Sequence, residues 1–360
     1  MLLNTLKRLL GRDGSGDCGT EARADGAASL RADGGTPTSD GFDIESVVSS
    51  LRESEAVRSA PFWLPPFLLM GFFVYGAIGW NVIISFTDFA GLQLPTYDPT
   101  AFDLEMYRRA LSDGQFWLAT RNTFVLLVSF TGLSLAGGLG LAILVDRGIR
   151  FENWFRTIYL LPFSLSFVVT AVFWRWMYNF DSGVINVFLR GIGLDFLASK
   201  WLAGGVELGA LSAIPLVPET LQFKLFAVIF ALLWQFSGYA MVVYLAGLRA
   251  IPDDQYEAAR VDGASTVRMY RRVILPQLRA STVSAAVVLM VFALKAFDFL
   301  YVMFGNNPGP TADILSTMMY RQAFAANEWA YGSAIAVVLF LVALAVVAPY
   351  LYGEYRRGEL

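Results

Sequence analysis

The stretch Ile251–Pro276, IPDDQYEAARVDGASTVRMYRRVILP, is a polar, helix-patterned segment between two long apolar runs. Pro252 ends the preceding run, and Asp253 or Asp254 can cap a new helix. Asp254 and Glu257 have the spacing of a capping box, in which side chains satisfy free backbone N–H groups reciprocally. The beginning of the stretch therefore predicts a helix outside the apolar runs.

The second half of this stretch predicts a turn and another helix. Gly263 is expected to be a break or a left-handed C-cap, because glycine takes a positive φ at no steric cost. An Arg-rich helical segment follows over Val267–Arg272, and Leu275-Pro276 is expected to end it. Such a helix can enter a groove of another protein, or the stretch can be an interfacial loop without a partner.

The composition of the whole chain indicates a polytopic membrane protein. Of its 360 residues, 56% are hydrophobic and only 16% are charged, against about 25% charged in ordinary soluble proteins. The net charge of −3 lies entirely in residues 1–60, so no basic field for nucleic acid is present.

Several kinds of chemistry are excluded by missing residue types. The chain has no histidine and only one cysteine, Cys18, which removes histidine-based acid–base chemistry, Cys- or His-based metal sites and a disulfide framework. None of its four lysines lies in a Gly-Lys-Ser/Thr context, so there is no P-loop. If the chain uses ATP, another subunit must bind it. We expect no enzyme and no metal site.

Six apolar runs are each long enough to cross a hydrocarbon core of ~30 Å, which takes about 20 residues. They cover residues 62–86, 117–145, 155–178, 223–248, 280–304 and 330–352. We expect an all-α membrane protein with six transmembrane helices, with the 251–276 loop between the fourth and fifth. A seventh apolar patch, Gly204–Pro218, is too short and broken to span, and is expected on the outer surface or as a re-entrant piece.

The second run contains a pattern of small residues. Gly132, Ala136 and Gly140 follow at four-residue spacing, with Ser134 and Gly138 offset from them. Small residues at this spacing let helix backbones approach closely. We therefore expect this span to pack in the middle of the bundle.

The first 60 residues precede the membrane domain, which covers residues 61–355. Residues 1–42 are acidic and rich in Gly, Asp, Ala, Ser and Thr, which predicts a disordered tail. Over residues 43–60, Ile44, Val47, Val48 and Leu51 fall at i, i+3, i+4 and i+7. This pattern predicts an amphipathic helix, lying on the membrane or a partner or simply exposed to solvent.

The distribution of Lys and Arg predicts that both termini are cytoplasmic (N-in/C-in). Loops 146–154 and 249–279 and the C-terminal tail carry ten such residues, whereas loops 87–116, 179–222 and 305–329 carry five, plus Lys224 at a border. Cytoplasmic loops are enriched in Lys and Arg. The tail 1–42 and the 251–276 loop are then inside the cell.

The central stretch also resembles a known motif. Glu257-Ala258-Ala259, three residues, Gly263, nine residues and Val273-Ile274-Leu275-Pro276 are similar to the EAA loop of ABC importer permeases, which has isoleucine in place of Val273. In that family the helix around the EAA residues sits in a cleft of the ATPase subunit. The resemblance thus implies roles in ATPase coupling for Glu257, Ala258, Ala259, Gly263, Leu275 and Pro276.

Downstream segments resemble the carbohydrate-uptake permeases of the maltose and glycerol-phosphate type. The matching segments are Ala296–Val302, Gly305–Thr311, Tyr320, Ala323-Phe324 and Tyr331-Gly332, with Leu160–Pro162, Gly183–Asn186, Leu245–Leu248 and Ile251-Pro252 upstream. Two features depart from the pattern: Asn307–Pro310 stands where the family often has Gly-Gly-Pro, and residues 203–222 look like an insertion.

The resemblance implies a set of partners. These are an ATP-binding ABC subunit dimer that holds ATP and Mg²⁺, a second homologous permease chain that forms a heterodimer, and an extracellular solute-binding protein. The chain itself is expected to hold no cofactor, to contact membrane lipid and no nucleic acid, and to lie in the plasma membrane of a prokaryotic cell.

Some residues within the runs are candidates for contact with the transported solute. Lys295 and Asp298 have i, i+3 spacing. They can form a structural ion pair, the Lys295 amine can snorkel to the interface, or both can contact the solute. Aromatic and polar side chains of the third and fourth runs either line a pathway or serve as interfacial anchors and packing; they are Trp174, Trp176, Trp234, Gln235, Ser237 and Tyr239.

The sequence thus predicts the permease subunit of an ATP-driven importer for a sugar or related polyol. An ABC importer for another solute and an autonomous secondary transporter are the alternatives. The latter is disfavoured because no inverted repeat is evident and residues for a proton relay are scarce.

Overall fold

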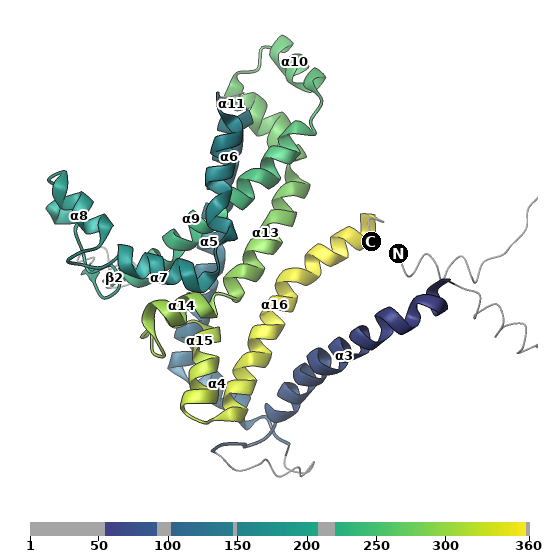
Figure 1. Ribbon diagram of the computed structural model, residues 1–360, viewed down its shortest axis with the longest axis vertical. Helices are drawn as coiled ribbons and strands as arrows, with labels where there is room; N and C mark the ends of the chain where they lie inside the picture. The colour runs from purple at the N-terminus through teal and green to yellow at the C-terminus, as the bar shows by residue number, and fades with distance from the viewer. Residues whose placement is uncertain (1–54, 92–101, 147–149, 208–219, 358–360) are drawn as a thin grey trace, which may run out of the picture. The chain divides into compact units, whose positions relative to one another are not determined.

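The computed structural model describes residues 55–91, 102–146, 150–207 and 220–357 (Figure 1). The chain divides into two compact units, residues 1–77 with 357–360 and residues 78–356. The predicted tail, residues 1–42, and residues 43–54 of the predicted amphipathic helix lie outside the described residues. Residues 55–60 belong to the first long helix, α3, Glu55–Ile84.

The described part of the chain is mainly helical. After α3 come α4, Glu105–Ser112; α5, Gly114–Asp146; α6, Glu152–Leu160; η2, Leu161–Ser164; α7, Phe167–Met177; α8, Val184–Gly191; η3, Asp195–Leu197; β1, Gly205–Glu207; β2, Thr220–Gln222; α9, Phe223–Arg249; α10, Asp253–Val261; α11, Thr266–Met269; η5, Tyr270–Ile274; α12, Leu275–Gln277; α13, Arg279–Leu294; α14, Phe297–Phe304; α15, Leu315–Tyr320; η6, Arg321–Ala325; and α16, Trp329–Arg357. The two strands pair antiparallel, with Val206 opposite Leu221. They flank part of the predicted seventh patch, whose residues 208–218 lie outside the described ranges.

Four helices in the described ranges are long and apolar enough to cross a membrane: Ser59–Ile84, Gly114–Asp146, Phe223–Arg249 and Trp329–Gly353. They coincide with the first, second, fourth and sixth predicted runs. Two bent helix pairs, Glu152–Ser164 with Phe167–Met177 and Thr266–Gln277 with Arg279–Leu294, raise the number of candidate spans to six if each pair is one span.

The third predicted run, 155–178, forms two helices with an angle of 101° between them, where one continuous helix was expected. The break has local causes. Pro162 is the second residue of the 3₁₀ turn η2, and Leu165 after it is extended, with ψ 143°. The hydroxyl of Ser166 caps α7 by accepting from the Val169 N–H, at 3.3 Å. A new helix start within an apolar run redirects the chain, which hydrophobicity alone does not reveal.

The fifth predicted run, 280–304, is also divided. Helix α13 ends at Leu294, Lys295 is its C-cap, and α14 begins at Phe297. Lys295 and Asp298 therefore lie at a break between two helices and not on one continuous helical face. Both are exposed, and no ion pair joins them within the part of the chain that the structure describes.

Close packing of α5 against α9 forms the middle of the unit 78–356, together with α13. A Cβ added at Gly138 would lie 2.4 Å from Cβ of Ala240, so the two backbones touch at this position. The stripe Gly132, Ala136 and Gly140 is exposed instead. The close approach thus lies on the face of the offset residues Ser134 and Gly138. The sequence could not distinguish the two faces, because the helix is apolar on all sides.

Polar contacts hold together the end of this unit that α4, α15 and the start of α16 form. The buried carboxylate of Asp313 accepts from the Thr317 hydroxyl at 2.7 Å and pairs with Arg321 at 2.5 Å. Arg109 on α4 pairs with Glu328 at 2.7 Å. The hydrogen bond from Arg109 to Glu328, together with the attraction between their charges, raises the pKa of Arg109. These contacts fix the loop between α14 and α16.

Candidate functional site

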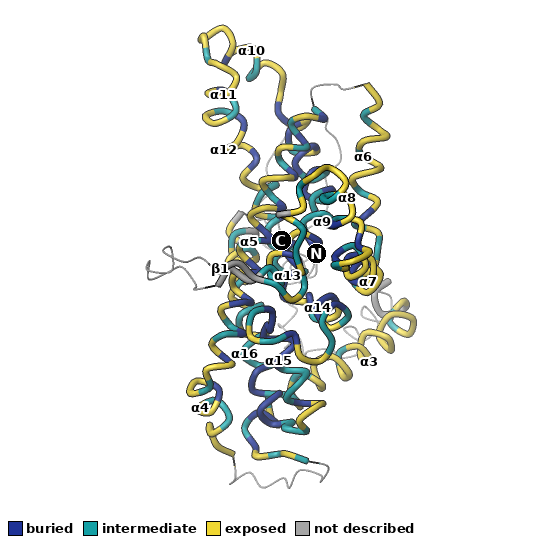
Figure 2. Tube along the Cα trace, turned by 90° about the vertical axis from the view of Figure 1, so that its left-hand side faces the viewer, coloured by how far each residue is buried: buried dark blue, intermediate teal, exposed yellow. Residues whose placement is uncertain are grey.

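The segment 253–277 projects as a helical hairpin from the ends of α9 and α13, at the end opposite α4 and α15 (Figures 1 and 2). The predicted helix, turn and second helix are confirmed as α10, a turn around Gly263, and the run α11, η5 and α12. The predicted capping box is wrong: Pro252 is the N-cap and no side chain caps the helix. Asp253 and Asp254 instead lie in the first turn, where their negative charges stabilise the helix by interacting with the positive end of its dipole.

The turn has the geometry of a Schellman motif. Gly263 has φ +70°, and its N–H bonds to the carbonyl of Arg260 at 3.0 Å, while the Ala264 N–H bonds to the carbonyl of Ala259 at 3.0 Å. These two bonds satisfy carbonyl groups that the end of α10 leaves free. The predicted left-handed cap at Gly263 is confirmed.

The motif residues of α10 divide between two sides of the helix. Ala259 is buried against a cluster that includes Met269 and Ile274 of the second arm, so its small side chain lets the two arms pack closely. Glu257 and Ala258 are exposed. Near the tip of the hairpin, Val261 is 87% exposed and Val267 77% exposed. The hairpin therefore presents apolar side chains beside charged ones on a surface that nothing else in the described chain covers.

The second arm contains the other two predicted motif residues. Leu275 and Pro276 are exposed and belong to α12, so the helical segment continues through the proline and ends at Gln277. The π-turn η5 ends at Ile274, two residues before Pro276, which has no N–H to bond the preceding turn. The bend of 67° comes after Gln277. The Gln277 amide donates to the Gln255 side chain, which joins this arm to α10.

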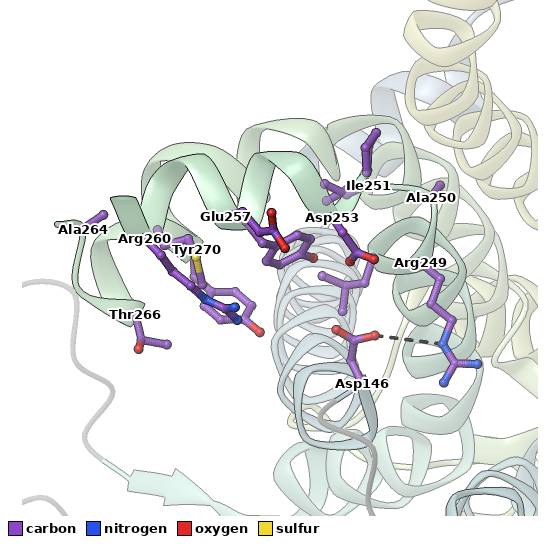
Figure 3. A pocket seen from close by; sticks show the side chains of 14 residues that line it. Asp146, Arg249, Ala250, Ile251, Asp253, Glu257, Arg260, Ala264, Thr266 and Tyr270 are labelled. Carbon is purple, nitrogen blue, oxygen red and sulfur yellow. Dashed lines mark ion pairs between the residues drawn. The ribbon is translucent and has the colours of Figure 1, made fainter. Parts of the chain in front are cut away.

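A pocket of about 880 Å³ lies between the hairpin and the ends of α5 and α9 (Figure 3). Charged groups enter it from several elements: Asp146 ends α5, Arg249 ends α9, and Glu257 and Arg260 come from α10. The phenol of Tyr256 also lines it, and burial, helped by the nearby Asp146, raises the pKa of Tyr256 above its usual value of 10. This phenol therefore stays neutral at physiological pH.

Arg249 connects three helix ends at this pocket. Its guanidinium lies 2.6 Å from a carboxylate oxygen of Glu152, at the start of α6, and 3.9 Å from Asp146. Because Glu152 begins the broken span and Arg249 directly precedes the hairpin, this pair joins the hairpin to α6. In the sequence, Arg249 is only one of the charges of the loop 249–279. The available signal was an acidic residue at the end of the second run and another at the start of the third.

The candidate solute-contacting residues lie elsewhere, toward the middle of the unit. Trp174 and Gln235 are buried, and the Gln235 amide donates to the carbonyl of Leu165 at 2.8 Å, across the break of the third run. Trp234 lies against Trp174, with ring centroids 5.7 Å apart. Trp176 is exposed. The structure therefore brings Trp174, Trp234 and Gln235 together beside the α6–α7 break. It leaves Lys295, the C-cap of α13, and Asp298, on α14, exposed.

Residues 134–355 match the family described as "Binding-protein-dependent transport system inner membrane component". A xylose/arabinose import permease of Haloferax volcanii is 52% identical over 325 residues, which cover 90% of this chain and 96% of that protein. A trehalose/maltose transport system permease of Thermococcus litoralis is 31% identical, over 71% of this chain and 80% of the relative. Among solved structures, a chain of a bacterial alginate ABC transporter shares the fold, with a TM-score of 0.63 and 23% identity over 85% of this chain and 98% of that one.

Proposed function

Because this chain belongs to the binding-protein-dependent transport system inner membrane components, we propose that it imports a small sugar, with xylose and arabinose as the first candidates. The chain is the membrane permease component of an ABC importer and not itself an enzyme. Support for the sugar class comes from its relatives, whose names specify xylose/arabinose and trehalose/maltose import.

The α10–α11 hairpin is the observation that supports an ATP-driven mechanism. Its EAA-type residues lie at the end of the unit, Glu257 and Ala258 are exposed, and the valines at the tip are uncovered. An exposed helix with an apolar tip and flanking charges suits recognition by a groove in a partner. The partner is an ATP-binding ABC subunit dimer, which binds ATP with Mg²⁺, while this chain holds no cofactor.

The remaining assembly follows from this role. The hairpin faces the cytoplasm, both termini are inside, and six spans cross the plasma membrane of a prokaryotic cell, with each broken helix pair counted as one. A second, homologous permease chain completes the pathway, and an extracellular binding protein delivers the sugar. When the ATPase dimer closes, α10 moves, and the Arg249–Glu152 ion pair transmits this movement to α6.

A reconstituted importer tests this proposal. The chain is assembled with its second permease and ATPase subunits in proteoliposomes, and uptake of radiolabelled xylose or arabinose is measured with the binding protein present. We expect uptake that requires ATP, and a Glu257→Lys variant that inserts normally but loses binding-protein-stimulated ATPase activity, because it places a cation at the docking face. Glu105→Lys, an exposed position on α4 at the opposite end, is the control.

Three results would count against it. Full stimulated ATPase activity in Glu257→Lys would exclude docking through α10. Uptake by this chain alone without ATP would favour a secondary transporter. Retention of a non-sugar solute by the cognate binding protein, with no uptake of either sugar, would favour an importer of another class.

A further inference from the structure

Helix α8 lies outside the candidate membrane spans. It follows α7 in the loop 179–222, and Figure 1 shows it projecting beyond the end of α7. A helix in such a loop is expected to turn its polar side chains toward water and its apolar side chains inward. Helix α8 has the opposite arrangement.

The outward face of α8 is entirely apolar. The exposed positions of the helix and its C-cap hold only these residues: Val184, Val187, Phe188, Gly191 and Ile192. Phe188 is 63% exposed. The two polar side chains of the helix, Asn186 and Arg190, are one turn apart and bond into the loop instead. Contiguous apolar patches of this kind mark interaction surfaces.

Hydrogen bonds of the buried Asn186 hold α8 in this orientation. Its side-chain amide donates to the carbonyls of Phe180, at 3.2 Å, and Ser199, at 3.0 Å. Its side-chain oxygen accepts from the Ser199 N–H at 3.3 Å and from the indole N–H of Trp201 at 2.9 Å. Both donors and both acceptor sites of this amide are thus used. The apolar face is therefore presented by a well-anchored helix.

Two cations meet beside α8 without an acidic partner. The Arg190 guanidinium lies 4.9 Å and the Lys200 amine 5.8 Å from the centre of the Phe180 ring. Among the residues that the structure describes, neither cation forms an ion pair, although Asp181 and Asp195 are exposed in the same loop. The two positive charges are therefore available to an anion from outside the chain.

Lipid fits this combination better than a protein partner does. The apolar face of α8 follows that of α7, where Val172, Phe173 and Trp176 are exposed on part of a candidate span. Protein interfaces contain about one hydrogen bond per 100–200 Å², and the outward face of α8 offers no side chain for one. An apolar helix face flanked by cations instead suits the boundary between acyl chains and anionic headgroups.

We propose that α8 is an interfacial helix. Phe188 and the apolar residues around it enter the acyl chains of the bilayer, while Arg190 and Lys200 bind the phosphate of an anionic lipid headgroup. This inference depends on the chain's membership of the permease family and not on the solute it carries. Anchored in this way, α7 keeps its place at the membrane surface when the hairpin moves α6.

The first test measures the depth of α8 in the complete importer, reconstituted in lipid bilayers. In a Cys18→Ser background, a nitroxide label is attached to Phe188→Cys or Val187→Cys. Its collisions with oxygen, which concentrates in lipid, are compared with its collisions with a water-soluble nickel complex. We expect both labels to collide mainly with oxygen and to lie about 5–10 Å into the boundary between headgroups and acyl chains.

Leu111→Cys is the matched control. Leu111 is 60% exposed, nearly the same as Phe188, but it lies on α4 beside the exposed Arg108, so its label should collide mainly with the nickel complex. If the label at position 188 meets the nickel complex as often as the label at 111, the face lies in water and the proposal is wrong. If both reagents are kept from position 188, another protein chain covers α8 and the proposal is equally wrong.

The second test addresses the headgroup site, with a fluorescent label at position 188 and brominated lipids that quench it on contact. At equal mole fraction, the anionic phosphatidylglycerol should quench more strongly than the zwitterionic phosphatidylcholine. Arg190→Gln combined with Lys200→Gln should lower this preference by about fivefold per cation, with the label at unchanged depth in phosphatidylcholine. Arg108→Gln on α4 should leave the preference intact. Equal quenching by the two lipids, or an equal effect of Arg108→Gln, would overturn the headgroup site.

Discussion

At the scale of single residues, glycines determine how closely α9 can approach its neighbours. A Cβ at Gly238 would lie 1.8 Å from the carbonyl oxygen of Tyr159 on α6, and a Cβ at Gly247 would meet the Ser281 side chain on α13 at 2.6 Å. Backbone atoms cannot move aside as flexible side chains can. Gly238 therefore brings α9 and α6 to a distance that any other residue would increase.

We expect Gly238→Ala to destabilise the chain by about 1–3 kcal/mol, because the added methyl group overlaps the Tyr159 carbonyl and forces α9 away from α6. The matched control is Gly140→Ala on α5, where nothing lies within 4 Å of the added Cβ. Thermal unfolding of the two variants in detergent measures the difference. A Gly238→Ala variant as stable as Gly140→Ala would show that α6 and α9 do not pack as described.

Local backbone conformation could be predicted from the sequence, whereas the burial of individual side chains could not. The left-handed turn at Gly263 could be predicted because it depends only on local backbone chemistry. In contrast, nothing local distinguishes Gly138, which touches α9, from Gly140, which is exposed, because both lie in a uniformly apolar helix. The sequence also could not decide whether Trp174 is buried, because its burial depends on which neighbours the break after Ser164 brings close.

At the scale of elements, breaks in the apolar runs matter as much as the helices themselves. Helices α6 and α7 meet at 101°, and Arg249 ties the start of α6 to the last residue of α9, directly before the hairpin. A helix that is interrupted can tilt at one end without moving the other. The ion pair therefore gives the hairpin a direct mechanical connection to one half of a divided span.

We expect Arg249→Gln to reduce sugar transported per ATP while changing stability by less than about 1 kcal/mol, because the pair is partly exposed to solvent. Arg249→Lys, which keeps the charge, should restore part of the coupling. The control is Arg156→Gln, since Arg156 pairs with Glu152 within α6 alone, at 3.9 Å. The measurement is sugar uptake and ATP hydrolysis in the same proteoliposomes. Equal uptake per ATP in Arg249→Gln and Arg156→Gln would contradict the proposed link between the hairpin and α6.

At the scale of the whole molecule, the two ends of the unit 78–356 have different chemistry. One carries the exposed hairpin with Arg260, Arg268, Arg271 and Arg272, and the other carries α4, α15 and the start of α16. The Lys and Arg bias predicts that the first end faces the cytoplasm. The separation of these two surfaces agrees with a protein that receives energy on one side of a membrane and solute on the other.

Cysteine labelling tests this orientation. In a Cys18→Ser background, which removes the chain's one cysteine, Leu111→Cys on α4 and Val267→Cys on the hairpin provide exposed thiols at opposite ends. A membrane-impermeant maleimide added to intact cells should label position 111 and not position 267, and both should react once the membrane is opened. The reverse pattern would invert the topology.

The turn at Gly263 has a consequence for how its motif should be understood. A Cβ at this position would meet nothing within 4 Å, so in this chain the glycine is not required for lack of space. What the turn requires is handedness: with φ at +70°, an L-residue is strained, whereas a mirror-image D-residue prefers this backbone conformation. Glycine suits this position because it is the one achiral residue among the genetically encoded amino acids.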